Sequence, residues 1–116
     1  DTPGINNKQH GLVKLGEGPT VQHGGANHPK IVSFIEQVSK DKEISIQHEA
    51  TSIRTGTDTD SIFYQKAGIA SALISLPLRY MHSPVETASM KDIEALIDLM
   101  VESVLALKPD QTFTVL

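Results

Sequence analysis

An apolar run, IASALISLPL at residues 69–78, constrains the possible folds of this chain most strongly. It lacks the apolar–polar alternation of a strand with one solvated face. Such a run is typical of a strand covered on both faces, as in a parallel sheet. Amphipathic helices then form the covering layers. The sequence therefore predicts an α/β fold in which residues 69–78 form a central strand.

Helical and extended patterns alternate along the rest of the chain. Residues 29–40 start with Pro29 and follow an i, i+3, i+4, i+7 apolar stripe, which predicts an amphipathic helix. A second helix is expected after Ser89, which resembles a capping box with Asp92, and it should stop before Pro109. We also expect short strands at residues 12–15, 20–23, 43–50 and 113–116, and a short helix at 61–67, begun by Asp58 or Asp60 and closed at Gly68.

Composition excludes several classes of function. The 116 residues have room for one domain, and the 39% hydrophobic and 21% charged content is ordinary for a globular protein. The net charge is −4 and the basic residues are scattered, so no nucleic-acid footprint is present. The absence of cysteine excludes disulfides and thiolate chemistry and fits a reducing compartment. The opening DTPGINNK has neither an initiator Met nor a signal-peptide apolar region, so we expect a longer parent protein.

His82 is the first candidate for function, because it follows the apolar run in a long polar loop. In open α/β sheets, ligands bind outside the carboxyl ends of the strands. Position alone leaves two interpretations open: a ligand, or a packed turn residue. Arg79 offers a fork of donors for a carboxylate, although a surface ion pair explains it equally well. No HExxH, GxSxG or P-loop motif is present.

The remaining candidates are weaker when they are taken one at a time. His23 and His28 flank a glycine-rich loop, but no cysteine or carboxylate is adjacent in the sequence, and His48 at a strand end is weaker still. The stretch 56–60, GTDTD, does not fit an EF-hand, which needs Gly at its sixth position and Glu at its twelfth. From the residues alone, the chain offers isolated ligands and no complete site.

Residues 56–84, GTDTDSIFYQKAGIASALISLPLRYMHSP, followed by MKDIEALIDLM at 90–100, resemble a known family. The resemblance is to the C-terminal part of the glutamyl, deblocking and tetrahedral aminopeptidases, dinuclear-metal peptidases of which some were once labelled endoglucanases. The segments DTPG at 1–4 and KLGEGP at 14–19 also resemble this family, so the likeness runs over nearly the whole chain. Thr59 and Ala70 depart from the usual Ala and Pro.

This resemblance implies a fold and a set of site residues. Residues 1–116 would be the C-terminal segment of a three-layer α/β/α domain with a mixed, largely parallel sheet, the N-terminal part and an inserted domain lying outside the segment. His82 would bind one of two divalent ions, zinc or cobalt. The other ligands and the general-base Glu would lie upstream, so the segment alone should be inactive. Substrate-binding residues would be Arg54, Gly56, Thr57, Asp58 and Arg79.

The resemblance also implies an activity and partners. The full protein would be a cytoplasmic metalloaminopeptidase that removes N-terminal residues from peptides. It would be a homo-oligomer, with dimers assembling to a dodecamer, and would have neither nucleic acid nor membrane as a partner. Two alternatives remain: a non-catalytic α/β binding or assembly module, and an inactive relative that has lost its upstream ligands.

Overall fold

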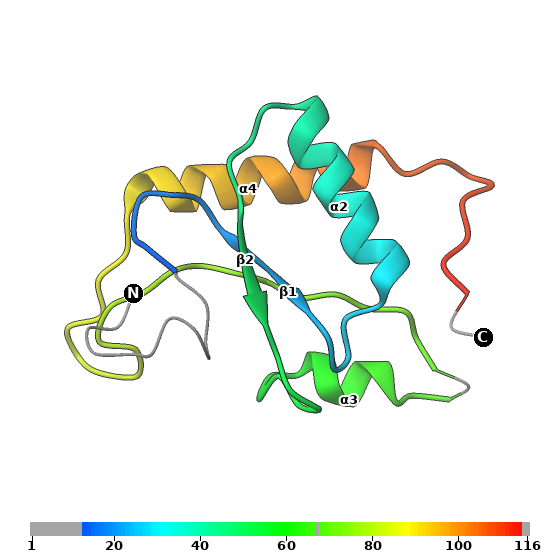
Figure 1. Ribbon diagram of the computed structural model, residues 1–116, viewed down its shortest axis with the longest axis horizontal. Coiled ribbons are helices and arrows are strands. Elements are labelled where there is room, and N and C mark those ends of the chain that lie inside the picture. Colours follow the sequence, from blue (N-terminus) through cyan, green and yellow to red (C-terminus); the bar gives the residue numbers. More distant parts are fainter. Residues whose placement is uncertain (1–12, 67, 115–116) are drawn as a thin grey trace.

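A mixed β-sheet and two long helices form the regular framework of the structure (Figure 1). The computed structural model describes residues 13–66 and 68–114. The sheet order is β2-β1-β3, with β1 parallel to β2 and antiparallel to β3. This arrangement confirms the predicted α/β class. The elements are β1 (Thr20–His23), α2 (Pro29–Asp41), β2 (Gln47–Ala50), α3 (Thr59–Phe63), β3 (Ile74–Ser75) and α4 (Met90–Leu105).

The hydrophobic core lies between the central strand and the two long helices. Val21 of β1 is fully buried. It packs with Val32 and Ile35 of α2 and with Leu99 of α4 in one cluster. Ile74 of β3 pairs with Val21 and packs against the same cluster. Strand β1 is therefore the element on which both helices and both neighbouring strands converge.

Helix α2 begins as the sequence predicts, and His28 explains why. His28 is the N-cap, and its Nδ1 accepts a hydrogen bond from the backbone N–H of Lys30. Its Nε2 lies 2.9 Å from the carbonyl oxygen of Thr114, to which it donates when Nδ1 is the acceptor. A single tautomer thus satisfies both ring nitrogens. His28 is therefore a structural residue.

Helix α4 also starts where predicted, but the expected capping box is wrong. The Ser89 side chain makes no capping hydrogen bond. Instead, the fully buried carboxylate of Asp92 accepts hydrogen bonds from the backbone N–H groups of Gly16 and Gly18, both at 2.8 Å. Asp92 therefore fastens the turn before β1 to the first turn of α4.

The same turn is held from its other side by the Gln47 side chain. Its amide nitrogen donates to the carbonyls of Lys14 and Gly18, and its oxygen accepts from Lys14 N–H, each at 2.8 Å. Gly18 has φ +103°, and a Cβ there would lie 2.1 Å from the Ser45 carbonyl oxygen. Only glycine fits at this position.

The prediction of a central strand at 69–78 is wrong. Only Ile74–Ser75 forms a strand, it is half-buried, and it lies at the edge of the sheet among the described residues. The run does follow β1, since Gln22 N–H donates to the Leu73 carbonyl. The Asn27 side chain, however, accepts from Leu73 N–H in place of a strand neighbour. A polar side chain thus interrupts the ladder.

Other boundaries differ as well. Residues 13–15 and 113–114 form no strand, whereas residues 12, 115 and 116 lie outside the described part of the chain. Strand β2 begins at Gln47 rather than at residue 43, although Ile44 and Ile46 still pack against the core. Helix α3 covers Thr59–Phe63 rather than 61–67, and its N-cap is Asp58.

Helix α4 presents a second apolar face away from Leu99. This face consists of side chains that are each more than half exposed: Ile97, Met100, Val101, Val104 and Leu105. Their spacing of three and four residues places them on one side of the helix. Contiguous apolar surface of this kind marks a site of contact with other protein.

We predict that Asp92→Ala lowers the free energy of unfolding of the intact protein by about 3 kcal/mol. The change removes two charge-assisted hydrogen bonds and leaves one buried and one half-buried N–H group without their acceptor. Asp98→Ala, at an exposed position of the same helix, is the matched control. Chemical denaturation measures both, and equal stability of the two variants would contradict the role of Asp92.

Candidate functional site

The loop that carries His82 is closed by its own backbone. Arg79 and Thr87 form an antiparallel bridge and exchange two hydrogen bonds, of 2.9 and 3.0 Å. Inside the loop, Ser83 Oγ donates to the Tyr80 carbonyl at 2.6 Å. Glu86 Oε1 accepts from the backbone N–H of His82. These contacts brace the loop at residues 79–87 from within.

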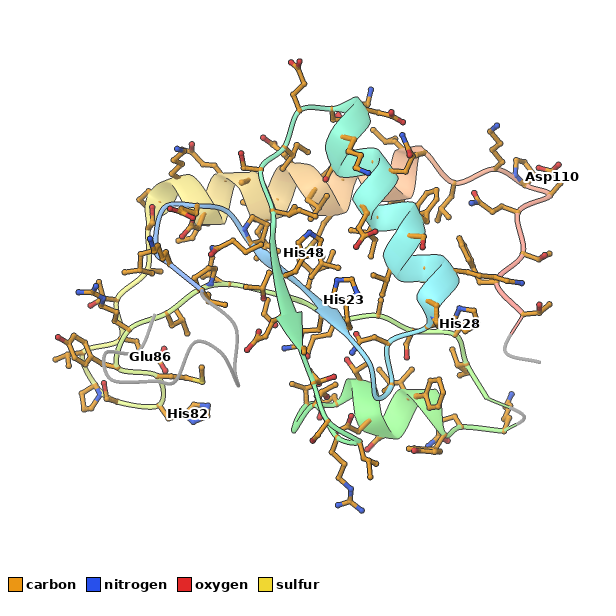
Figure 2. The ribbon with its side chains drawn as sticks, viewed as in Figure 1. His23, His28, His48, His82, Glu86 and Asp110 are labelled. Atoms are coloured by element: carbon orange, nitrogen blue, oxygen red, sulfur yellow. The ribbon has the colours of Figure 1, made fainter. Side chains whose placement is uncertain are left out.

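His82 itself occupies an unusual backbone conformation. Its φ is +63°, and that of Tyr80 is +56°, both in the left-handed region that non-glycine residues rarely adopt. Such conformations are frequent at binding and active sites, where the surrounding structure holds them. The imidazole of His82 is exposed, and among the described residues none is hydrogen-bonded to the ring (Figure 2). The ring is accessible to an external ligand.

A second loop carries the other expected site residues, and Asp60 organises it. The Asp60 carboxylate accepts from Thr55 N–H at 2.9 Å, Thr55 Oγ1 at 2.8 Å and Gly56 N–H at 2.9 Å. The hydrogen bond from the Thr55 backbone is the main cause that lowers the pKa of Asp60 below its usual range. This role of Asp60 was not predicted from the sequence, although the spacing of the two acids in GTDTD is a visible signal for it.

The predicted substrate-binding residues of this loop are all exposed: Arg54, Gly56, Thr57 and Asp58. Asp58 caps α3 without a side-chain hydrogen bond. In Figure 1, the segment before α3 lies apart from the loop at residues 79–87, which contains Arg79 and His82. The described residues alone do not bring the two loops into one crevice, and their joint role stays a prediction.

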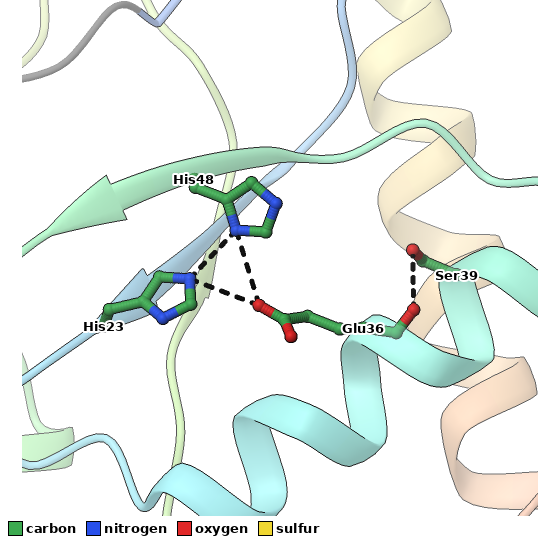
Figure 3. Close-up of polar contacts among 4 residues, drawn as sticks. All are labelled: His23, Glu36, Ser39 and His48. Carbon is green, nitrogen blue, oxygen red and sulfur yellow. Dashed lines mark hydrogen bonds and ion pairs between the residues drawn. The ribbon is translucent and has the colours of Figure 1, made fainter.

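A third group of polar residues is contributed by β1, α2 and β2, near the centre of the view in Figure 2. His23 at the end of β1, Glu36 on α2 and His48 on β2 point toward one another (Figure 3). His23 Nε2 lies 2.9 Å from His48 Nδ1, and Glu36 Oε1 lies 3.4 Å from the first and 3.5 Å from the second. In the described part of the chain, this is the one group of three or more such side chains with metal-ligand geometry.

This group is not apparent from the sequence, in which His23 and His28 flank one glycine-rich loop. In the structure, His28 instead caps helix α2. Glu36 belongs to the polar side of an amphipathic helix, a position that carries no signal by itself. The grouping depends on the register of β1 and β2, which is visible only in the folded chain.

Comparison with known proteins places the chain in a family. The family model described as M42 glutamyl aminopeptidase matches residues 1–99. The chain belongs to the M42 glutamyl aminopeptidase family. This finding confirms the resemblance of residues 56–84 and 90–100 noted in the sequence.

The similar proteins are aminopeptidases and a peptidase. A lysyl aminopeptidase of Pyrococcus furiosus is 38% identical over 104 residues, which are 90% of this chain and 30% of that protein. The aminopeptidase APDkam598 of Desulfurococcus kamchatkensis is 30% identical with a TM-score of 0.85, over 100% of this chain and 34% of that one. The TET1 peptidase of Pyrococcus horikoshii, described as assembling into a tetrahedron or a large octahedral shell, is 26% identical with a TM-score of 0.68, over 86% and 29%.

The matches cover only part of each relative. This chain spans about a third of the length of each relative. In the described ranges 13–66 and 68–114, none of the helices combines the length and the apolar character that a membrane span requires.

We predict that Asp60→Asn destabilises the intact protein in a pH-dependent way. The folded-state pKa of Asp60 is lowered, so its stabilising effect is complete above the unfolded pKa of about 3.9 and is lost as the pH falls through the folded value. The difference in unfolding free energy between wild type and variant should therefore be largest near neutral pH and shrink below about pH 4.

Denaturant titrations at several pH values measure this difference. Asp58→Asn is the matched control and should leave stability nearly unchanged, because the Asp58 side chain makes no capping hydrogen bond. A difference for Asp60→Asn that stays constant with pH would contradict the prediction.

Proposed function

We propose that the protein to which this chain belongs is a metal-dependent aminopeptidase that releases N-terminal residues from peptides. The M42 family match and the aminopeptidase relatives support this proposal. The observation that carries it is the geometry of His82, an exposed imidazole at a positive φ on a loop braced by Glu86 and by the Arg79–Thr87 bridge. Residues 1–116 would form the C-terminal segment of the catalytic domain.

The proposed cofactor is a pair of divalent ions, zinc or cobalt, with His82 as the ligand that this chain provides. The exposed ring fits that role. No group of three ligand side chains gathers at the His82 loop within the described residues, so further ligands and the general base would come from elsewhere in the protein. Paired metals supply an acidified water and a polarised carbonyl. The contribution of this chain is to position one imidazole, and the segment alone would be inactive.

The substrate would approach between the two loops. Arg54, Gly56, Thr57, Asp58 and Arg79 are the residues that we propose to contact it. Asp60 holds the backbone of Thr55 and Gly56 and so fixes the loop that presents the first four of them. Among these residues, Arg54 is the candidate to bind an acidic side chain at the N-terminus of the substrate, because guanidinium forms charge-assisted hydrogen bonds with carboxylates.

We further propose a homo-oligomer in which dimers assemble to a dodecamer in the cytoplasm. The described assembly of the TET1 peptidase supports the oligomer. The exposed apolar face of α4, from Ile97 to Leu105, provides surface for burial against another subunit or another part of the same protein.

The second candidate function is a non-catalytic α/β binding or assembly module, or an inactive relative of the family. It is favoured by one observation, the incomplete set of metal ligands around His82 among the described residues. Reading the coding sequence upstream of Asp1 separates the two. Further Asp and Glu residues on strand ends favour the peptidase, and a stop codon favours the module.

We predict that His82→Ala in the full-length protein reduces aminopeptidase activity to background and removes one metal ion per subunit. The reason is the loss of one imidazole from the dinuclear site. Metal analysis of the purified protein and hydrolysis of N-terminal chromogenic substrates measure both effects. Val85→Ala, an exposed change in the same loop, is the control. A metal content of His82→Ala equal to that of the wild type would refute the assignment.

We predict that Arg54→Gln selectively impairs cleavage of acidic N-terminal residues. The value of kcat/KM for an N-terminal Glu substrate should fall by about 10- to 100-fold, which corresponds to one charge-assisted hydrogen bond. The value for an N-terminal Leu substrate should stay near that of the wild type. Lys108→Gln, another exposed basic residue, is the control. An equal fall for both substrates would argue against a role in specificity.

A further inference from the structure

We propose that His23, Glu36 and His48 form a binding site for a zinc-class divalent ion. The three side chains come from β1, α2 and β2, and their ligand atoms all lie within 4.8 Å of one another. The group does not include His82, which lies apart from it in Figure 2. The proposal concerns a site built wholly from residues of this chain.

Two of the three separations between ligand atoms match those around a tetrahedral ion. Zinc binds imidazole nitrogen and carboxylate oxygen at about 2.0–2.2 Å, so neighbouring ligand atoms lie roughly 3.3–3.5 Å apart. The separations of Glu36 Oε1 from the two imidazoles, 3.4 and 3.5 Å, fall in that range. His23 Nε2 and His48 Nδ1 lie 2.9 Å apart, which is a hydrogen-bond distance, and a bound ion would replace this hydrogen bond and separate the two nitrogens.

A network of hydrogen bonds explains the arrangement less well. A charge-assisted N–H···O contact is usually about 2.7–2.9 Å long, and both contacts of Glu36 exceed this length. The three atoms lie within 3.5 Å of one another, and each offers a lone pair once the proton shared by the two imidazoles has left. Two imidazoles and one carboxylate form the His₂Glu ligand set of a known class of zinc sites.

The backbone explains why the two histidines face the same way. In the parallel register, Val21 pairs with His48 and His23 pairs with Ala50. Paired residues share a face, and Val21 and His23 share one because they are two residues apart. His23 and His48 are therefore diagonal neighbours on the face against which α2 packs. Glu36 lies next to Ile35, whose side chain is buried in the core.

The ligands are borne by rigid elements. Thr51, which follows β2, donates to the carbonyl of His23 from its backbone N–H at 2.8 Å and from Oγ1 at 3.0 Å. Helix α2 is fixed by Val32 and Ile35 in the central cluster. Ligands on fixed strands and helices bind a metal with little loss of conformational entropy.

The site is open to solvent on one side. The side chains of His23 and His48 are 42% and 54% exposed, and that of Glu36 is 29% exposed. His23 and Glu36 also line a pocket of about 200 Å³. An ion held by three protein ligands would keep a fourth position toward this space for water or a small anion. A bound ion would also cross-link β1 and β2 to α2.

The test uses the full-length protein, stripped with a chelator and titrated with zinc against a chromogenic competitor. His82→Ala serves as background, so that metal held through His82 is counted separately. We expect His23→Asn and His48→Asn together to remove one further zinc ion per subunit. Glu36→Gln should lower the affinity for that ion at least about 10-fold, because one of three ligands is lost. Cobalt in place of zinc should give visible absorption bands that the double variant lacks.

Stability supplies a second readout. Zinc should raise the Tm of the stripped protein, and this rise should shrink in the double variant, because a ligand that binds only the folded state stabilises it. Glu49→Gln, next to His48 but on the other face of β2, is the control and should behave like the parent. Equal zinc stoichiometry with and without the two histidines, or binding only at millimolar zinc, would overturn the proposal. Because it is read in the His82→Ala background, its failure would leave the aminopeptidase assignment intact.

Discussion

The structure depends on the hydrogen bonds that the buried Asp92 carboxylate makes with the backbone of Gly16 and Gly18. These bonds join positions that are 76 and 74 residues apart, and they act on the turn that leads directly into β1. The Gln47 side chain holds the same turn from β2. Because β1 is the central strand, fixing its entry also fixes its register with β2 and β3. A carboxylate is suited to this task, since its two oxygens accept from two N–H groups at once.

Local patterns predicted the helices because their causes are local. The apolar stripes of α2 and α4 and the Pro29 start need no distant partner. The strand predicted at 69–78 is reduced to Ile74–Ser75 because a residue distant in the sequence interrupts its pairing. Asn27, far away in the sequence, takes the Leu73 N–H that a continuous ladder would use. Asp92 was likewise assigned to a local capping box, whereas its partners lie in the turn before β1. Both errors have the same source, a side chain that is hydrogen-bonded to backbone far away in the sequence.

The candidate sites show the same division. His82 was singled out by its position after the apolar run and by the family resemblance of residues 56–84, and the structure adds the positive φ and the closed loop. The group of His23, Glu36 and His48 needs the register of two parallel strands and the rotation of a helix, and no spacing in the sequence encodes either. Asp60 is intermediate, because its partners are only four and five residues away. The sequence GTDTD predicted a loop at residues 56–60, but it did not show which of the two acids organises that loop.

The two sites that we propose share one support. The His82 loop leaves β3, which pairs with β1, and returns to α4, whose Asp92 is bound to the turn before β1. Both ends of the loop are therefore tied to the same strand. His23 ends that strand, and His48 is set beside it by the parallel register. The His82 loop and the pair of His23 and His48 lie apart, yet both are positioned by β1. Disturbing the turn at Gly18 would thus displace both, whereas changes within either site should act on that site alone.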